Sequence, residues 1–193
     1  MLRLSKFALM FGMIIFLFAS CKKDVEGCTD VQADNYNADA NVSTSTCTYQ
    51  KRFTGDYDCT FGCAGTLAGV FQTAEMNVSE LAVKSEVNLI IQSTIGPIPV
   101  KGTVISKDSI KIDAVLDNLE VVPEIFFPGT GTTPIKVSGT VKSTLGISSD
   151  NKKIAGILEL TLANKEPVTV SGIPFPAGTL KLTDSCDFEG TKR

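Results

Sequence analysis

The sequence contains no histidine and no tryptophan. Histidine is the commonest general base and the commonest ligand of transition metals, so its absence excludes most familiar active-site designs. Serine, threonine, tyrosine, lysine and carboxylate side chains remain, but no spacing among them singles out a catalytic site. We therefore expect a protein that is not an enzyme and that holds no cofactor and no metal.

Positive charge is also scarce, since 18 basic residues face 21 acidic ones and the net charge is −3. Removal of Arg3 and Lys6 with a signal segment leaves 16 basic residues against the same 21 acidic ones, which makes the net charge −5. No basic stripe remains, so nucleic acid is not an expected partner. The 193 residues, 43% of them apolar, can form one ordinary domain with a sizeable core.

Long hydrophobic runs are absent as well, and the longest is FALMFGMIIFLF at residues 7–18. Its 12 residues are too few to span about 30 Å of hydrocarbon comfortably. Two basic residues precede the run, and the small residues Ala19 and Ser20 follow it. This order is typical of a secretory signal peptide, which we place at residues 1–20.

The stretch FASC at residues 18–21 resembles the lipobox of bacterial lipoproteins, with Phe18 where a leucine is usual. The resemblance implies that the Cys21 thiol receives a diacylglyceryl group, and that cleavage leaves Cys21 as the first residue of a lipid-anchored chain. KKDVE at residues 22–26 resembles the signals that send lipoproteins of the Bacteroidetes group to the outer face of the outer membrane. We assign residues 21–26 to a lipid-anchored tether. The alternatives are an ordinary secretory signal with Cys21 as a disulfide partner, and a plain solvated tether.

Residues 27–49, GCTDVQADNYNADANVSTSTCTY, are rich in Asp and Asn and carry a cysteine near each end. Such a segment cannot bury enough apolar surface to order itself. A disulfide between Cys28 and Cys47 would close a loop of about 20 residues, and loop-closure entropy would then contribute about 3 kcal/mol. GCTD, NYN and CTY stand in register with a short motif of Bacteroidetes surface proteins, which the segment resembles, with Val31 and Ala38 in place of prolines.

Alternating oxygen donors at Asn35, Asn37, Asp39 and Asn41 are faintly similar to the start of a calcium loop. The turn glycine and the later bidentate glutamate of such a loop are absent. A disulfide-closed spacer is therefore the preferred interpretation, and calcium binding is the alternative.

From residue 53 onward, short alternating runs are separated by Gly, Pro, Asn and Asp, which is typical of antiparallel β-structure. Eight to eleven such runs predict an antiparallel β-barrel or β-sandwich over residues 53–193. The best helix candidate is residues 74–85. The predicted strands are 53–60, 66–72, 86–92, 98–105, 108–115, 119–126, 135–144, 154–163, 167–172, 178–184 and 186–191. The residues predicted to point inward are Ile110, Ile112, Val137, Val141, Leu158, Leu160, Leu180 and Leu182.

The two ends of this domain, FTGDYDC at 53–59 and CDFEGTK at 186–192, are near mirror images. One antiparallel register aligns three pairs of residues at once, which predicts that the first and last strands are neighbours and close the sheet. The domain thereby resembles the lipocalin-like domains of Bacteroidetes lipoproteins, and this implies a calyx-like barrel but carries over no ligand residue. The aligned pairs are Gly55 with Gly190, Tyr57 with Phe188, and Cys59 with Cys186.

Three cysteines in the β domain leave one of them unpaired. The mirror register favours a disulfide between Cys59 and Cys186, although direct cross-strand disulfides are geometrically tight. Pairing of Cys63 with Cys186 is the alternative, and a clip between Cys59 and Cys63 is third. A metal site at these cysteines lacks a fourth ligand of the right type.

Two loops carry aromatic side chains that are candidates for ligand contacts at a barrel rim. PEIFFPGTGTTP at residues 123–134 contains Phe126 and Phe127, and SGIPFPAGT at residues 171–179 contains Phe175 between two prolines. Exposed phenylalanines would form an apolar contact patch, whereas buried ones would fill the core.

These features predict a cell-envelope lipoprotein that acts as a non-catalytic binding or interaction module at the outer membrane, facing the cell exterior. Its partners would be the membrane, through the lipid on Cys21, and either a small apolar ligand or another surface component. A purely structural envelope lipoprotein is the first alternative, and a hydrolase is the second. An interior cavity on the order of several hundred Å³ would favour ligand binding, whereas a filled core would favour the structural alternative.

Overall fold

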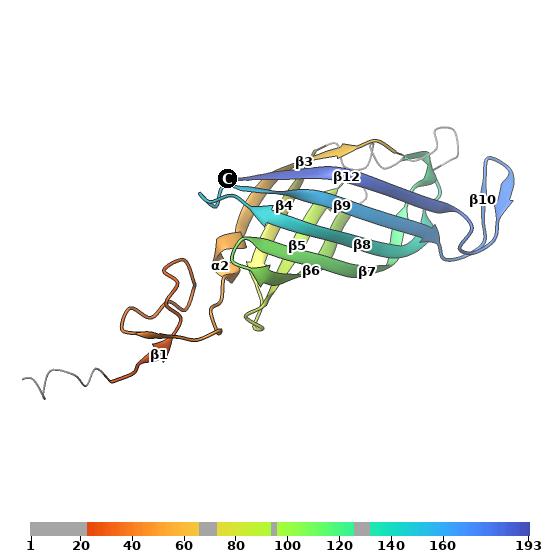
Figure 1. Ribbon diagram of the computed structural model, residues 1–193. Helices are drawn as coiled ribbons and strands as arrows, with labels where there is room; N and C mark the ends of the chain where they lie inside the picture. Colours follow the sequence, from red (N-terminus) through yellow and green to blue (C-terminus); the bar gives the residue numbers. More distant parts are fainter. Residues whose placement is uncertain (1–22, 66–72, 94–95, 126–131) are drawn as a thin grey trace, which may run out of the picture. The chain divides into compact units, whose positions relative to one another are not determined.

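The structure is a computed structural model, and it describes residues 23–65, 73–93, 96–125 and 132–193 (Figure 1). The described residues form two compact units. The smaller unit consists of residues 23–31 and 35–47, and the larger one of residues 32–34 and 48–193.

The larger unit contains a closed barrel of eight strands, each antiparallel to its neighbours, which confirms the predicted all-β fold class and selects the barrel over the sandwich (Figure 1). The first seven strands follow one another around the wall, and the last strand lies between the first and the seventh. Closure gives every strand two partners, so the barrel has no free edge. The strands are β3 (Gly55–Cys63), β4 (Thr73–Glu80), β5 (Glu86–Ser93), β6 (Gly96–Ser106), β7 (Ser109–Val121), β8 (Ile135–Ile147), β9 (Lys153–Asn164) and β12 (Lys181–Lys192).

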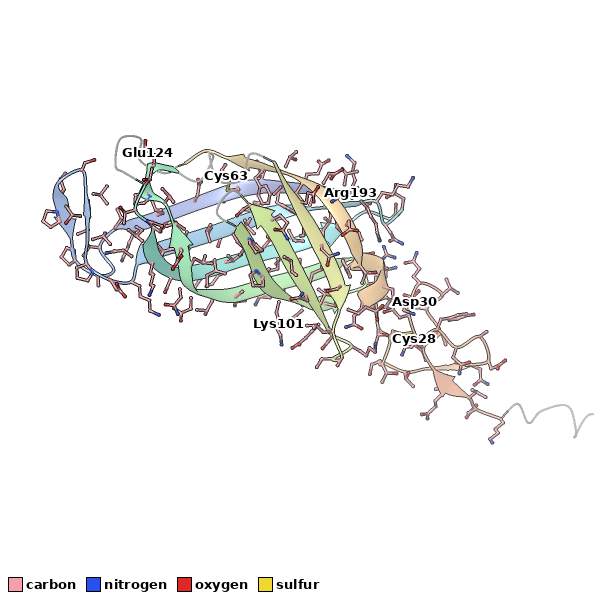
Figure 2. The ribbon with its side chains drawn as sticks, turned by 180° about the vertical axis from the view of Figure 1, so that it is seen from behind. Cys28, Asp30, Cys63, Lys101, Glu124 and Arg193 are labelled. Atoms are coloured by element: carbon pink, nitrogen blue, oxygen red, sulfur yellow. A yellow bond between two sulfur atoms is a disulfide. The ribbon has the colours of Figure 1, made fainter. Side chains whose placement is uncertain are left out.

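Alternation of side chains builds the barrel wall. In β12, Leu182, Cys186 and Phe188 point inward and are at most 5% exposed, whereas the alternate residues Thr183, Ser185 and Asp187 are exposed. Charged side chains such as Lys101 and Arg193 lie on the outside (Figure 2). An antiparallel sheet with this pattern has one face packed on the core and the other in water.

The predicted pairing of the first and last strands is confirmed, but its predicted register is wrong by four residues. Cys186 lies opposite Cys63 rather than Cys59, and Cys59 lies opposite Gly190. A shift by an even number keeps every side chain on its own face, so the hydrophobic pattern fits both registers.

Packing decides between the two registers. The observed one places the rings of Phe61 and Phe188 together, with centroids 5.1 Å apart. It also sets Gly190 against Cys59, where a Cβ atom would lie 3.3 Å from the Cys59 sulfur. The predicted Cys59–Cys186 disulfide is therefore replaced by the alternative, Cys63–Cys186, and Cys59 is a free buried thiol.

Other predicted elements differ in extent or type. The helix candidate at 74–85 is wrong, because residues 73–80 form β4 with Ala74, Met76 and Val78 inward. Predicted strands 108–115 and 119–126 overlap one long strand, β7, whose pairing with β8 shifts between Leu116 and Leu119. Predicted strands 178–184 and 186–191 likewise merge into β12. Predicted strand 66–72 lies outside the described residues.

The short helix α2 (Gln50–Phe53) closes one end of the barrel (Figure 1). The buried Gln50 side chain donates from Nε2 to three carbonyl oxygens at the β4–β5 connection, among them that of Leu81 at 3.1 Å. The buried Arg52 guanidinium pairs with Asp108, at the β6–β7 turn, with 3.0 Å between nitrogen and oxygen. Phe53 is fully buried in the core. Helix α2 therefore belongs to the same compact unit as the barrel.

The opposite end of the barrel carries the longer connections between strands (Figure 1). The β7–β8 connection begins with the 3-10 helix η1 (Pro123–Ile125), and the β9–β12 connection contains the hairpin of β10 (Val168–Val170) and β11 (Ile173–Phe175). We call this end the loop-bearing end and define it by residues 63–65, 122–125 and 165–180.

The smaller unit is held by the disulfide between Cys28 and Cys47, which confirms that prediction. The two-residue strand β1 (Glu26–Gly27), just before Cys28, pairs in parallel with β2 (Val42–Ser43), which lies inside the closed loop. Within the described residues, no helix combines the length and the apolar composition needed to cross a bilayer.

Asparagine side chains organise this loop through local hydrogen bonds. The Asn41 Oδ1 atom accepts a hydrogen bond from the backbone N–H of Val25 at 2.8 Å, and Asn37 Oδ1 accepts one from Asp39 at 3.1 Å. These oxygens are among the donors that a calcium ion would need, and here they serve the backbone. The arrangement favours the spacer interpretation over calcium binding.

Candidate functional site

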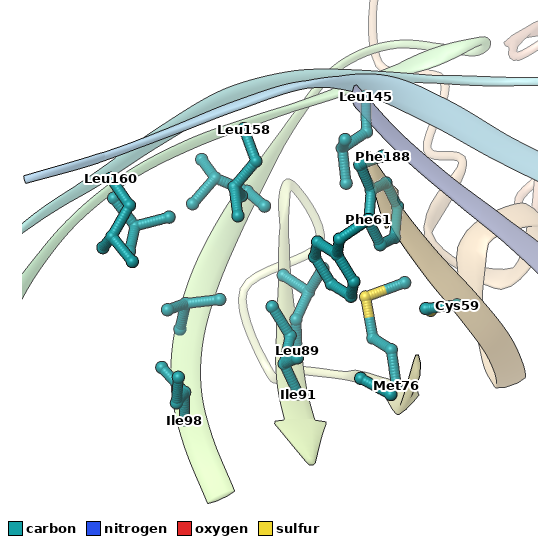
Figure 3. Packing of buried hydrophobic residues seen from close by; sticks show 14 of the residues in the cluster. Cys59, Phe61, Met76, Leu89, Ile91, Ile98, Leu145, Leu158, Leu160 and Phe188 are labelled. Atoms are coloured by element: carbon teal, nitrogen blue, oxygen red, sulfur yellow. The ribbon is translucent and has the colours of Figure 1, made fainter. Parts of the chain in front are cut away.

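Buried apolar side chains from several strands pack together in the barrel interior (Figure 3). Leu89, Leu145 and Leu160, from three different strands, are each at most 2% exposed. Side chains that lined a ligand cavity of roughly several hundred Å³ would be exposed to that cavity. The exposed fractions of the described inward side chains are instead those of a packed core. Seven of the eight residues predicted to point inward are 0–5% exposed: Ile110, Ile112, Val137, Val141, Leu158, Leu160 and Leu182.

The eighth residue, Leu180, precedes β12 and is half-buried. Of the candidate rim residues, Phe175 is half-buried in β11. Phe126, Phe127 and Cys21 lie outside the described residues, so the predictions for these three stay predictions.

The β10–β11 hairpin forms a two-stranded sheet of its own beside the barrel end (Figure 1). Ser171 and Gly172 join its strands with φ angles of 51° and 78°, as a two-residue type I′ turn requires. Ile173, directly after the turn, is 58% exposed. Pro174 has no N–H to offer, so a further strand cannot pair fully along β11. The hairpin presents apolar side chains rather than an open backbone edge.

Asn164, the last residue of β9, fixes the base of this hairpin from the inside. It is 2% exposed, and its Nδ2 atom donates to the carbonyl oxygens of Glu166 (2.8 Å), Phe175 (3.4 Å) and Pro176 (2.9 Å). Its Oδ1 atom accepts the backbone N–H of Leu180 at 2.9 Å. The buried side-chain amide of Asn164 therefore joins the two ends of the β9–β12 connection.

Lys165 holds the same base from the outside. Its Nζ atom lies 2.9 Å from Asp117 Oδ1 and 2.7 Å from Asn118 Oδ1, at the bulge in β7. The hydrogen bonds from Lys165 and then from Ser138 lower the pKa of the Asp117 carboxyl. The hydrogen bonds of Asn164 and of Lys165 together hold the base of the hairpin, and the apolar side chain of Ile173 beyond that base is exposed.

A second polar group faces the interior near this end, beside the disulfide. The Cys63–Cys186 bond joins the last residue of β3 (labelled in Figure 2) to the middle of β12. Asp184 lies two residues before Cys186 on the same inner face and is 8% exposed. Both of its carboxylate oxygens accept the backbone N–H of Gly65, at 3.2 and 3.1 Å. The carboxylate thus holds the chain just beyond the disulfide.

The free thiol of Cys59 is buried in the barrel. It is 3% exposed, and burial, with a smaller contribution from the charge of Asp58, raises its pKa to about 12. A thiol with such a pKa carries almost no thiolate at neutral pH, and the thiolate is the nucleophile.

The sequence contains a signal for two inward polar residues that are not among the predicted site residues. Asn164 ends the run LELTLAN and Asp184 stands in KLTDSC, each at an inward position of an alternating strand. A polar residue at such a position must find hydrogen-bond partners, so it marks a place where loops attach.

Comparisons with protein-family models, with curated proteins and with solved structures found no significant match.

Proposed function

We propose that the protein is a lipid-anchored, non-catalytic interaction module of the bacterial cell envelope that contacts another surface component through its loop-bearing end. The observation that carries the proposal is the contrast between a filled barrel and an ordered, apolar hairpin. The described side chains that face the interior are almost completely buried, whereas Ile173 is 58% exposed on a hairpin whose base is held by the hydrogen bonds of Asn164 and Lys165. A rigid apolar tip loses little conformational entropy on binding.

The sequence supports the anchor and the location. A short apolar run followed by FASC supports acylation of Cys21, and KKDVE supports display on the outer face of the outer membrane. The GCTD, NYN and CTY motif and a closed barrel whose first and last strands pair support a lipocalin-like lipoprotein of the Bacteroidetes type.

Site-specific photocrosslinking in cells tests the contact surface. A photoreactive residue at position 173 should give a discrete crosslinked product. The matched control is position 115, because Val115 is also β-branched and is 79% exposed, but on the barrel wall. No product at 173, or equal products at both positions, would contradict the proposal. That result would favour a structural envelope lipoprotein, which the filled core also supports.

The anchor has a separate test. Cys21→Ser should release the protein from the membrane fraction or leave its precursor unprocessed, because the acyl chains supply the membrane affinity. Intact mass of the extracted wild-type protein should show acyl chains on Cys21. An N-terminus without acyl mass would refute the anchor.

A further inference from the structure

Three metal-ligating side chains meet on the inner wall of the barrel near its loop-bearing end. The sulfur atoms of Cys63 and Cys186 and a carboxylate oxygen of Asp184 all lie within 4.8 Å of one another. Cys63 and Cys186 are directly opposed across β3 and β12, with Cα atoms 4.1 Å apart. Asp184 shares the inner face of β12 with Cys186. We propose that reduction of the Cys63–Cys186 disulfide converts this cluster into a site for a thiophilic divalent metal ion such as Zn²⁺.

The redox step is a two-electron thiol–disulfide exchange. A dithiol attacks the bond, its own two sulfurs form a disulfide, and Cys63 and Cys186 each leave as a thiol. Zn²⁺ then binds the two sulfurs as thiolates and displaces two protons. In the oxidised protein both sulfurs are engaged with each other, so the site exists only after reduction.

The barrel keeps the two sulfurs together after reduction. Residues 181–192 of β12 remain paired with β9 on one side, and β3 remains paired with β12 and β4 on the other. Two Zn–S bonds of about 2.3 Å in tetrahedral geometry place their sulfurs about 3.8 Å apart, which side chains on opposed cross-strand residues can reach without backbone movement.

The donor set selects the class of metal. Two thiolates and one carboxylate favour Zn²⁺ over Ca²⁺ or Mg²⁺, which take oxygen ligands. Hydrogen bonds from the backbone N–H groups of Gly65 and Ser185 orient the Asp184 carboxylate beside the two sulfurs. Three protein ligands leave the fourth position for water or for a ligand of another molecule.

The chain offers a matched control for the two cysteine ligands and a conservative substitution for the carboxylate ligand. Cys59 lies on the same strand as Cys63 and also faces inward, but it stands opposite Gly190 and has no part in the cluster. Cys59→Ser therefore removes a barrel thiol without touching the proposed site. Asp184→Asn keeps the shape of the carboxylate and removes its charge.

Site-resolved alkylation of the full-length wild-type chain tests the proposal. The protein is reduced with a phosphine under nitrogen and treated with iodoacetamide with and without Zn²⁺, and labelled cysteines are identified by peptide mass. Zn²⁺ should slow alkylation of Cys63 and Cys186 together by at least about 10-fold, because metal-bound thiolates are poor nucleophiles. Equal alkylation with and without Zn²⁺ would overturn the proposal, and so would loss of the barrel's circular dichroism signal on reduction alone.

Equilibrium binding gives the second measurement. In a chain with Cys28→Ser and Cys47→Ser, so that only barrel cysteines respond to the reductant, one Zn²⁺ should bind per reduced chain with release of two protons. Cys63→Ser should weaken this binding by at least about 100-fold and Asp184→Asn by about 10-fold, whereas Cys59→Ser should leave it unchanged. Binding that is equal in the oxidised and reduced proteins would contradict the site.

Discussion

Among single residues, Cys63 and Cys186 have the largest expected effect on stability. Their disulfide closes a loop with a sequence separation of 123, for which loop-closure entropy gives about 5 kcal/mol. Cys186→Ala should therefore lower the free energy of unfolding by about 4–5 kcal/mol, and Cys59→Ala by only about 1–2 kcal/mol for the lost buried sulfur. Urea denaturation measures both losses, and reduced wild-type protein should match Cys186→Ala. Equal losses in the two variants would show that the disulfide does not stabilise the barrel.

The raised pKa values of Tyr57 and Cys59 should make the free energy of unfolding depend on pH in alkaline solution. Burial raises the pKa of Tyr57 from 10.0 to about 12, with a smaller contribution from Cys59, and burial raises the pKa of Cys59 from 9.0 to about 12. Because both groups lose their protons more readily in the unfolded chain, stability should be fully present below pH 9.0 and fall as the pH rises towards about 12.

Urea denaturation at several alkaline pH values measures this fall. Cys59→Ala should reduce the slope of stability against pH, and adding Tyr57→Phe should reduce it further. The Cys59 variant also removes the free thiol that would attack the disulfides at high pH. An identical slope in all three proteins would mean that neither group is responsible.

Among the strands, the alternating pattern predicted which residues face inward but not how the first and last strands align. Ile110, Ile112 and Leu160 are identified as inward residues because their neighbours are polar. The register of β3 against β12 could not be obtained in this way, since registers that differ by an even number of residues bury the same side chains. The contact between Phe61 and Phe188 becomes visible only in three dimensions.

The sequence predicts a helix where strand β4 forms, and the reason again lies in contacts between strands. The run AEMNVSE alternates over only seven residues, and its Ala, Glu and Met are residues that favour helices. Its place between β3 and β5 decides the structure, because a strand there pairs on both sides and completes the wall. Tertiary pairing therefore outweighs local propensity in this element.

The hairpin between β9 and β12 should depend on Asn164. In Asn164→Ala three carbonyl oxygens lose their shared donor and the Leu180 N–H loses its acceptor, so the free energy of unfolding should fall by about 2–3 kcal/mol. Amide exchange in residues 168–175 should accelerate by at least about 10-fold while the barrel strands stay protected.

Lys165→Ala is the control for that variant. Its ion pair with Asp117 is largely exposed, and exposed pairs contribute about 1 kcal/mol or less. Hydrogen exchange followed by mass spectrometry compares the two variants. If Lys165→Ala loosens the hairpin as much as Asn164→Ala, then the outer clamp and not the buried amide fixes its base.

For the protein as a whole, the closed barrel is the main source of order in the fold. Its closed wall removes every free edge, and the described side chains that face its interior are almost completely buried. The sequence predicted the closed wall from the mirror-like ends, but it gave no measure of interior space, because Leu158 or Leu160 would face a cup and a core equally well. Volume depends on how side chains from opposite walls meet, which no local pattern records.

The division into two units predicts that their disulfides act separately. Cys28 and Cys47 lie in the smaller unit, whereas Gln50 belongs to the barrel's unit and donates hydrogen bonds to the β4–β5 connection. The double variant Cys28→Ser, Cys47→Ser should therefore shift the thermal midpoint of the barrel by less than about 2 °C. Gln50→Ala should lower it by roughly 4–8 °C, since losing about 2 kcal/mol of buried hydrogen bonding has that effect in a domain of this size. Circular dichroism melts of both variants measure the shifts. A large shift in the cysteine variant would mean that the small unit and the barrel unfold as one body.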